Sequence, residues 1–422
     1  MKKRNKSIMT KKTLYFLFVF IFFFSCKPTK ENKTSDIPVI DIESGIKEFV
    51  IKNLSEYASD IRYVQLETNE SCLVTQTIKN IYLEDNKLFI HDNEVYLKVF
   101  DAITGKYLYN IGSKGQGPGE LAGLTDVHIN ASEKRILLNW SVFTHLFDFE
   151  GNFLGRLYRP EFAESDEAEK TAPNVAMINE NLFAVGFYTP KDHQENAAMI
   201  YDKEQNIISV LKSYKDRIQP PGFSTYNLSH QGGSFHWCMD KLHYYRGLSD
   251  TIYTFEDRNK SLEPYLVFDF GKHSSNYNYN PGTENEDVIT VQALSENNRA
   301  LFVDFYSTRM SPEPYEGEIW RSTGWTKGFF NNFYAVYDKE KEALYCLLQP
   351  TKSVLGLNND LDNGIPFWPK SISNKNELID YYHAYKFLEH ANKLTNPGEA
   401  IKELIQSIDE EDNPIIVIAT GK

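Results

Sequence analysis

A short apolar strand preceded by a polar turn recurs along the chain. Five copies begin their apolar part at Leu88, Ile136, Leu182, Leu242 and Ala300, at intervals of 48, 46, 60 and 58 residues. Each copy follows a segment in which apolar and polar residues alternate, which is typical of a half-buried strand. In the clearest copies, a later strand ends in an aromatic residue and an aspartate, as at Phe100-Asp101 and Phe147-Asp148. The pattern predicts units of four short strands, and a degenerate sixth copy is expected near 363–367.

Units of this kind cannot bury both faces of their sheets alone, so the sequence predicts that they stack radially as the blades of a β-propeller. The longer intervals exceed the roughly 40–50 residues of the tightest propeller repeats, which predicts long loops between blades. The candidate loops are 161–170, 214–234, 273–287 and 307–325. The recurring aspartate is interpreted as a cap for the backbone of the turn that follows it.

A ring of blades must close, because its end strands otherwise present free edges. Segments 49–51 and 61–66 have strand character and precede the first copy, and 414–419 lies at the far end of the chain. We therefore expect the N- and C-terminal segments to share the last blade.

Helical spacing replaces the strand pattern shortly before the last strand. Leu378, Tyr382, Tyr385 and Leu388 recur at every third or fourth position, with Asn374 as a candidate N-cap. A second amphipathic stretch contains Ile401, Leu404, Ile405 and Ile408. The sequence thus predicts a helical insertion at about 374–409 and a closing strand at about 414–420. Packing of the helices over the final blade is favoured over docking of a partner.

Composition restricts the class of protein further. The chain has 422 residues, of which 41% are hydrophobic, enough for a large core. Its 45 basic and 58 acidic residues give a formal charge of −13, which argues against nucleic acid as a partner. Four cysteines in so long a chain cannot form a disulfide framework. Cys72, Cys238 and Cys346 are expected to be buried, with at most one disulfide among them.

The N-terminus has the organisation of an export signal. Residues 1–12 contain six basic residues and no acid, and the apolar run 14–24 is too short to span a bilayer. The following Phe23-Phe24-Ser25-Cys26 resembles the lipobox of bacterial lipoproteins, in its looser Bacteroidetes form. The resemblance implies that 1–25 is a signal peptide and that Cys26 is the lipid attachment site. The alternative is an ordinary signal peptide in which Cys26 is incidental.

Residues 26–37 are polar and lack periodicity, so they are interpreted as a flexible tether, with the propeller over 38–422. Several acyl chains on Cys26 would hold the protein at the membrane, whereas a single chain binds only marginally. Removal of 1–25 would change the formal charge from −13 to −19. We expect a monomer at the outer membrane, on the periplasmic side rather than the surface, because few acids follow Cys26.

Three further segments carry a resemblance to a known family. The run Ile111-Gly112-Ser113-Lys114-Gly115-Gln116-Gly117-Pro118-Gly119-Glu120 resembles the inter-blade signature of NHL-like six-bladed propellers, which are common among Bacteroidetes lipoproteins. Segments 362–370 and 411–414 resemble C-terminal signatures of the same family. The similarity extends over about 37–422. It implies an all-β fold, a six-bladed β-propeller of four-stranded blades with a small helical insertion near the C-terminus, located in the cell envelope. It implies no particular biochemical activity.

Motifs for catalysis or metal binding are weak. The glycine-rich run 112–119 lacks the spacing of a phosphate-binding loop, and 358–364 does not fit an EF-hand, since Pro369 stands where the bidentate glutamate belongs. His230, His236 and His243 are close in sequence, but residues an odd number apart on one strand face opposite sides. No Gly-x-Ser-x-Gly elbow is present. We therefore expect no catalytic residue, no metal and no cofactor.

Aromatic residues near expected loops are the remaining candidates. Trp320, Trp325 and Trp368 could stack on a sugar or anchor a partner protein, although tryptophan also fills the cores between blades. Trp325, Trp368 and Asp362 are the candidate contacts for a ligand or partner. The leading hypothesis is a lipid-anchored, non-enzymatic propeller that binds a protein or carbohydrate.

The alternative hypothesis is a hydrolase or lyase on the same scaffold, acting on a carbohydrate or lactone in the central channel. Such an enzyme requires carboxylates, histidines or asparagines from at least three blades to converge. A structural envelope protein is the third hypothesis, and it would show no convergence of polar side chains at the mouth of the channel.

Overall fold

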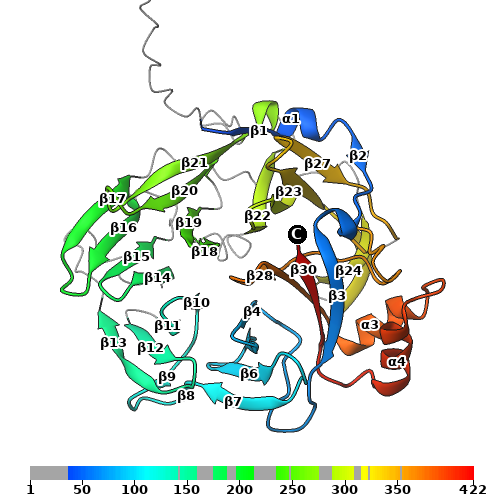
Figure 1. Ribbon diagram of the computed structural model, residues 1–422, viewed down its shortest axis with the longest axis horizontal. Helices are drawn as coiled ribbons and strands as arrows, with labels where there is room; N and C mark the ends of the chain where they lie inside the picture. Colours follow the sequence, from blue (N-terminus) through cyan, green and yellow to red (C-terminus); the bar gives the residue numbers. More distant parts are fainter. Residues whose placement is uncertain are drawn as a thin grey trace, which may run out of the picture. The chain divides into compact units, whose positions relative to one another are not determined.

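Six sheets, each of four antiparallel strands, stand around a common axis in the computed structural model (Figure 1). The structure describes residues 37–140, 143–158, 174–187, 196–212, 234–246, 249–274, 288–307, 315–321, 324–351 and 354–422, with only the backbone described for 315–321 and 324–330. Residues Pro38–Lys422 belong to one compact unit. The arrangement is the six-bladed β-propeller that the repeats and the family resemblance predicted.

In each blade the first strand lies nearest the axis and the fourth lies outermost (Figure 1). Blades one, two and three consist of β4 (Asn80–Glu84), β5 (Lys87–His91), β6 (Leu97–Asp101) and β7 (Tyr107–Ile111); β10 (Asp126–Asn130), β11 (Arg135–Trp140), β12 (Phe143–Asp148) and β13 (Phe153–Tyr158); and β14 (Asn174–Asn179), β15 (Leu182–Gly186), β16 (Asn196–Asp202) and β17 (Ile207–Lys212). Blades four, five and six consist of β18 (Ser234–Cys238), β19 (Lys241–Tyr245), β20 (Thr251–Glu256) and β21 (Ser261–Asp269); β22 (Ile289–Glu296), β23 (Ala300–Ser307), β26 (Asn332–Asp338) and β27 (Ala343–Leu347); and β28 (Ser371–Ile372), β29 (Glu377–Tyr382), β30 (Ile415–Gly421) and β3 (Ala58–Gln65).

The five predicted apolar strands are the second strands of blades one to five, namely β5, β11, β15, β19 and β23. The expected sixth copy near 363–367 is wrong, because this segment contributes only an isolated bridge between Leu357 and Phe367. Its apolar side chains Ile365 and Phe367 fill clusters beside blade six and belong to none of its strands. Of the expected inter-blade loops, 161–170 and most of 214–234 and 273–287 lie outside the described residues.

The N-terminal segment runs along the outer edges of three consecutive blades. Strand β1 (Val39–Asp41) pairs in parallel with β21, and after helix α1 (Ile42–Gly45), strand β2 (Phe49–Val50) pairs in parallel with β27. A short 3-10 helix (Leu54–Glu56) then leads into β3. These pairings cover strand edges that would otherwise be open to another chain.

Blade six combines strands from the N-terminal and C-terminal segments of the chain. Strand β30 lies between β29 and β3, with Asp60 opposite Thr420 and Gln65 opposite Ile415. The N- and C-terminal segments therefore share this blade, as their strand character led us to expect.

The recurring aspartates cap turns, as interpreted from the sequence. Asp101 Oδ1 accepts a hydrogen bond from the Thr104 amide at 2.7 Å, and Asp148 Oδ1 accepts one from the Asn152 amide at 2.8 Å. The glycine-rich run forms the connection from blade one to blade two, with the short parallel pair β8 (Ser113–Lys114) and β9 (Glu120–Leu121). Gly112 has φ 79° there, a conformation that favours glycine.

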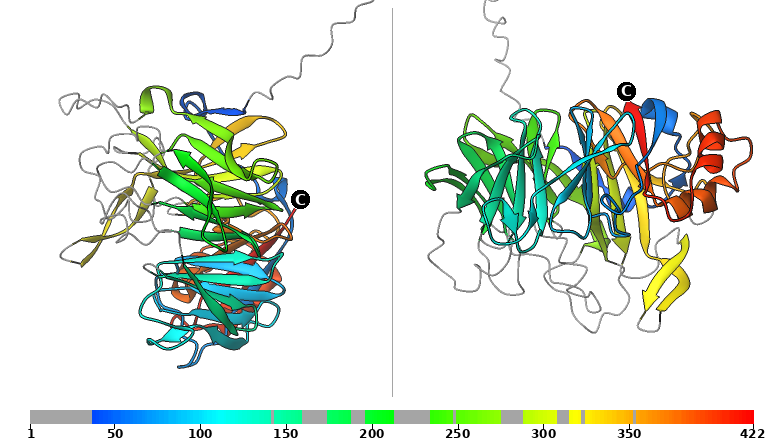
Figure 2. Two further views of the ribbon diagram at one scale, coloured as in Figure 1. Left: turned by 90° about the vertical axis from the view of Figure 1, so that its left-hand side faces the viewer. Right: turned by 90° about the horizontal axis from the view of Figure 1, so that it is seen from below.

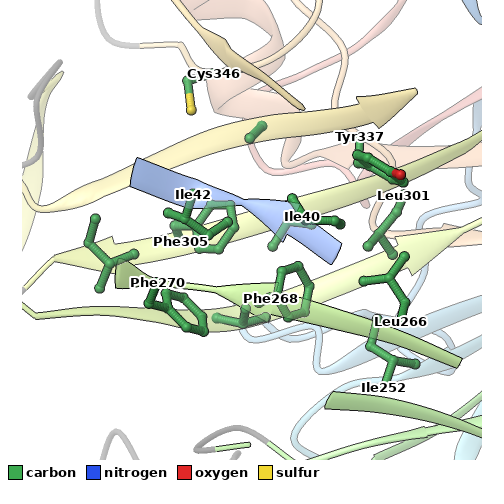
Figure 3. Packing of buried hydrophobic residues seen from close by; sticks show 14 of the residues in the cluster. Ile40, Ile42, Ile252, Leu266, Phe268, Phe270, Leu301, Phe305, Tyr337 and Cys346 are labelled. Atoms are coloured by element: carbon green, nitrogen blue, oxygen red, sulfur yellow. The ribbon is translucent and has the colours of Figure 1, made fainter. Parts of the chain in front are cut away.

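Each interface between neighbouring blades is filled by its own hydrophobic cluster. Figure 3 shows the cluster between blades four and five, where Phe268 of β21 packs edge-to-face against Phe305 of β23 with ring centroids 6.2 Å apart. Ile40 of β1 belongs to the same cluster, so the N-terminal segment adds to the core. Cys72, Cys238 and Cys346 are free and buried, as expected.

Two helices lie between β29 and β30, but the insertion begins later than predicted. The expected helix from Asn374 is wrong over Glu377–Tyr382, which forms strand β29. Leu378 packs between blades five and six and Ile379 between blades six and one, so both faces of β29 are apolar and imitate a helical spacing. The helices that do form are α3 (Ala384–Ala391) and α4 (Glu399–Ser407). No helix in the described ranges is long and apolar enough to cross a membrane.

A hairpin of β24 (Tyr315–Arg321) and β25 (Gly324–Phe330) is inserted within blade five. It lies between β23 and β26, which pair directly, so 307–325 is not a loop between blades. The turns between the first and second strands of the blades lie on one face of the ring, together with the C-terminus. We call this face the turn face. Both views in Figure 2 show the hairpin projecting from the opposite face.

Candidate functional site

The four residues singled out from the sequence do not form one site in the described structure. Cys26 lies outside the described residues. Trp325 is in β25, directly opposite Trp320 of β24, and nothing is described of its side chain. The other two candidates, Trp368 and Asp362, have separate surroundings near blade six.

Trp368 is buried between blades five and six, with 5% of its surface exposed. One face of its ring stacks on Tyr334 at 4.3 Å between centroids, and Phe302 meets it edge-on at 5.7 Å. Its backbone N–H donates to Asp380 Oδ2 at 2.9 Å. Trp368 therefore fills an inter-blade core, and a ligand could stack on its ring only after a neighbour moved.

Asp362 lies beside the helical insertion. Its backbone carbonyl accepts a hydrogen bond from Gly398, the residue before α4, at 2.7 Å. Burial raises the pKa of its carboxyl group, and hydrogen bonds from Tyr63 and Asn359 oppose that rise. In this structure Asp362 ties α4 to strand β3, which is the outermost strand of blade six.

A group of polar residues surrounds Lys370, which precedes the innermost strand of blade six. Lys370 Nζ donates to the Tyr334 hydroxyl at 3.4 Å and lies 5.5 Å from the centre of that ring. Asp304, the cross-strand neighbour of Tyr334, accepts a hydrogen bond from Asn332 Nδ2 at 3.0 Å. Burial raises the pKa of both Asp304 and Asp380 to about 6, although the charge of Lys370 opposes the rise in each. We call Asp304, Tyr334, Trp368, Lys370 and Asp380 the Lys370 cluster.

A second cluster joins blades four and five near the turn face. His236 of β18 and His243 of β19 are direct cross-strand partners, and both rings face Glu296 at the end of β22. Glu296 Oε2 lies 3.1 Å from His236 Nε2 and 2.8 Å from His243 Nδ1. Lys339 Nζ pairs with the other oxygen, Oε1, at 2.6 Å. We call His236, His243, Glu296 and Lys339 the His–Glu cluster.

Electrostatic interactions keep the Glu296 carboxylate charged within the largely buried His–Glu cluster. Burial alone would raise the pKa of Glu296, but the two imidazoles and the Lys339 charge outweigh it and hold that pKa well below its usual value. Burial is also the largest influence on His236 and lowers its pKa below 6.5. The carboxylate is therefore ionised while His236 is neutral near pH 7. Two imidazole nitrogens and one carboxylate oxygen within 4.8 Å of one another are a donor set suited to a metal ion.

Sequence reasoning missed the His–Glu cluster for a definite reason. The odd spacing of His236 and His243 excludes a common face only if one regular strand carries both. The chain turns back at 239–240, so the two residues occupy opposite positions of a hairpin and share a face. Glu296 comes from the next blade, and no spacing rule connects it to the histidines.

A groove of about 310 Å³ lies on the turn face at the boundary of blades three and four. Trp237 and Phe255 contribute aromatic surface, and Asp240, Glu256 and Asp257 line it as acids. Lys241 Nζ pairs with Glu256 Oε1 at 3.0 Å inside this acidic lining. Its volume is at the lower end for small-molecule pockets, and it lies open to solvent.

The fold and these clusters define the class of protein as a six-bladed β-propeller with polar groups gathered at the interfaces between blades. Within this class, the chain belongs to the family described as domain of unknown function DUF4934, whose match covers residues 37–420. The comparison with curated proteins gave no match.

Solved structures resemble the chain in fold. A "Putative exported protein" from Bacteroides fragilis NCTC 9343 shares 18% identity with a TM-score of 0.63, and the alignment covers 92% of this chain and 99% of that one. A member of the DUF4221 family from Bacteroides vulgatus ATCC 8482 shares 11% identity with a TM-score of 0.45, over 86% of this chain and 97% of that one. At 18% identity, the likeness to the Bacteroides fragilis protein concerns the fold alone.

Proposed function

We propose that this chain is an NHL-like lipoprotein of the cell envelope, anchored through Cys26, that binds a partner protein through hairpin β24–β25. The observation that carries the binding proposal is the hairpin itself. Blade five is complete without it, because β23 pairs directly with β26 through seven residue pairs. An inserted element that the sheet does not require is a candidate for a role outside folding.

The backbone of the hairpin suits protein recognition. Among the described strands, β24 and β25 pair only with each other, so each leaves one edge free for strand addition by a partner. The register places Trp320 opposite Trp325, and directly opposite residues lie on the same face of a two-stranded sheet. Tryptophan is enriched among the residues that dominate binding energy at interfaces. Of the expected contacts, Trp325 is thus the one on a projecting element, while Trp368 and Asp362 have structural roles.

Location in the envelope is supported by the N-terminal sequence. The basic stretch, the short apolar run and Cys26 follow the order of a lipoprotein signal. The Bacteroides fragilis neighbour, whose printed name describes it as exported, is consistent with this location. We place the mature chain on the periplasmic side of the outer membrane.

The geometry supports binding over catalysis. A hydrolase or lyase in the channel would require convergent polar groups from at least three blades. In the described part of the chain, the Lys370 cluster draws on blades five and six and the His–Glu cluster on blades four and five. Neither reaches a third blade.

Photo-crosslinking in the living envelope tests the binding proposal. A photoreactive residue at position 325 of the full chain should crosslink to a defined envelope protein, whereas one at Tyr158, 54% exposed on blade two, should not. With that protein purified, Trp325→Ala should weaken binding by about 30-fold, since truncating a central interface tryptophan typically costs at least about 2 kcal/mol. Tyr158→Ala is the matched control and should bind like the unmodified chain.

Two outcomes would overturn the assignment of the hairpin. One is equal crosslinking from positions 325 and 158, and the other is unchanged affinity of Trp325→Ala for the captured protein. Crosslinking to an oligosaccharide in place of a protein would mean that the partner is a carbohydrate. The anchor is tested separately: mass spectrometry should find residues 1–25 absent and acyl chains on Cys26, and an unmodified thiol there would refute it.

A further inference from the structure

The geometry points to a divalent metal site of the Zn²⁺ type between blades four and five, with His236 Nε2, His243 Nδ1 and Glu296 Oε2 as the ligands. This site is independent of hairpin β24–β25 and of the lipid anchor. The donor atoms come from three strands, β18, β19 and β22, so folding of the two blades assembles them.

The three donor atoms are close to the spacing that a metal ion requires. They lie within 4.8 Å of one another, and the two distances to Glu296 Oε2 are 3.1 and 2.8 Å. Ligand atoms about 2.0–2.1 Å from a tetrahedral zinc lie about 3.3 Å apart. The side chains must therefore move by roughly an ångström or less at each atom, with no change in the paired strands.

Lys339 supports this arrangement from the side away from the proposed ion. Its ammonium group pairs with Glu296 Oε1 and leaves Oε2 to the two histidines. A carboxylate that binds a metal through one oxygen commonly has its other oxygen held by a hydrogen-bond donor. Lys339 Nζ also lies 5.8 Å from the centre of the Tyr265 ring, whose centroid is 4.4 Å from that of His243. These contacts orient the carboxylate and one imidazole.

Metal binding requires a lone pair on the nitrogen of each imidazole that faces Glu296. In the metal-free cluster, one N–H of each imidazole donates to Oε2; binding requires each ring to move that proton to its other nitrogen. Among the described residues, His236 Nδ1 has no hydrogen-bond partner that would fix its tautomer. Each ring then presents a lone pair to the ion, and the ion replaces two hydrogen bonds with three coordination bonds.

Access differs among the members of the cluster. The side chain of Glu296 is fully buried and that of His243 is 2% exposed, whereas His236 is 19% and Lys339 16% exposed. The ion would therefore sit at the boundary between core and solvent. Three protein ligands leave a fourth position for water or a small ligand on the His236 side.

Other polar contacts between blades are simpler. Asn297 Nδ2 donates to Asn376 Oδ1 at 2.8 Å between blades five and six, and Lys134 pairs with Asp85 at 2.5 Å between blades one and two. One bond of this kind is enough to join neighbouring turns. Joining two blades does not require two imidazoles directed at one buried carboxylate oxygen. For this reason we assign a metal ion to the His–Glu cluster.

Direct metal binding tests the proposal on the full chain, purified with a tag that contains no histidine and freed of metal by a chelator. Titration with Zn²⁺ should show one site with a dissociation constant in the micromolar range or below. Co²⁺ should give the visible absorption of a four-coordinate site with nitrogen and oxygen ligands. His236→Gln should weaken zinc binding by more than about 100-fold, because losing even an outer partner of a metal site costs about 10–100-fold.

The matched control is His390→Gln, since His390 lies in α3, far along the chain from the cluster. It should bind zinc like the unmodified chain. If His236→Gln fails to fold, a crystal of the unmodified chain grown with Zn²⁺ gives the answer, because anomalous scattering should place the ion between the three donor atoms. Absence of one-site binding at 100-fold molar excess of zinc, or an ion located elsewhere, would show that the cluster is only an ion-pair clamp between blades.

Discussion

Asp380 and Glu296 are both buried, yet their pKa values move in opposite directions. Glu296 faces two imidazoles and an ammonium group at hydrogen-bonding distances, so its charged form is favoured. Asp380 accepts backbone hydrogen bonds from Trp368 and Tyr381, and Lys370 acts on it only through its charge. Burial therefore dominates at Asp380 and raises its pKa to about 6.

This difference predicts how stability depends on pH. In the unfolded chain Asp380 ionises near its ordinary pKa of 3.8, whereas in the folded chain it stays protonated up to about pH 6. Its contribution to stability is thus complete below pH 4 and is lost as the pH rises through 6, by about 3 kcal/mol. In urea unfolding, Asp380→Asn should gain about that much relative to the unmodified chain between pH 4 and 7. The exposed Asp240→Asn serves as the control, and a pH-independent difference for Asp380→Asn would contradict the assignment.

Contacts between residues close in sequence could be predicted, whereas those of the His–Glu cluster could not. Turn-capping by Asp101 and Asp148 was predictable, because donor and acceptor lie within four residues. The pairing of His236 with His243 depends on the position of one turn, and the approach of Glu296 depends on how two blades pack. Burial of Trp368 likewise follows from contacts with Tyr334 and Phe302, which belong to another blade.

At the scale of elements, local pattern was sufficient where a continuous apolar run follows a polar turn. The second strands of blades one to five have this form, with both faces buried, and were predicted correctly. Strand β29 also has buried residues on opposite faces, Leu378 and Ile379, but Asp380 ends its apolar run after two residues. An element buried on both sides loses the two-residue period, and its apolar positions then match a helix equally well.

Helix α3 begins directly after that strand and packs on blade six. Phe387 is fully buried, with its ring 6.0 Å from that of Tyr63 in β3. Phe387→Ala should lower the free energy of unfolding by about 3–5 kcal/mol, because it removes a large core side chain. Tyr385→Ala on the same helix removes a residue that is 39% exposed and should cost less than about 1 kcal/mol. Equal effects of the two changes in a denaturant titration would mean that α3 does not form part of the core.

At the scale of the whole molecule, the ring depends on its N-terminal segment as much as on its repeats. Strands β1, β2 and β3 cover the outer edges of blades four, five and six in turn. The strand character of the N- and C-terminal segments predicted that they share one blade. The parallel pairings of β1 and β2 could not be predicted, because a strand of two or three residues carries too little pattern.

Closure also determines where functional groups can gather. Every polar cluster described above lies where two neighbouring blades meet, and the positions of its members follow from the radial packing. A chain that did not close would leave β3 and β29 without their shared partner β30 and expose two long edges.

Deletion of residues 413–422 is the most direct test of this architecture. The deletion removes β30, the strand that joins the two ends of the chain in blade six. Thermal unfolding followed by circular dichroism should show that the shortened chain has lost the cooperative transition of the full chain, while removal of Lys422 alone should preserve it. A deletion variant that melts cooperatively at the temperature of the full chain would contradict a ring closed by its own termini.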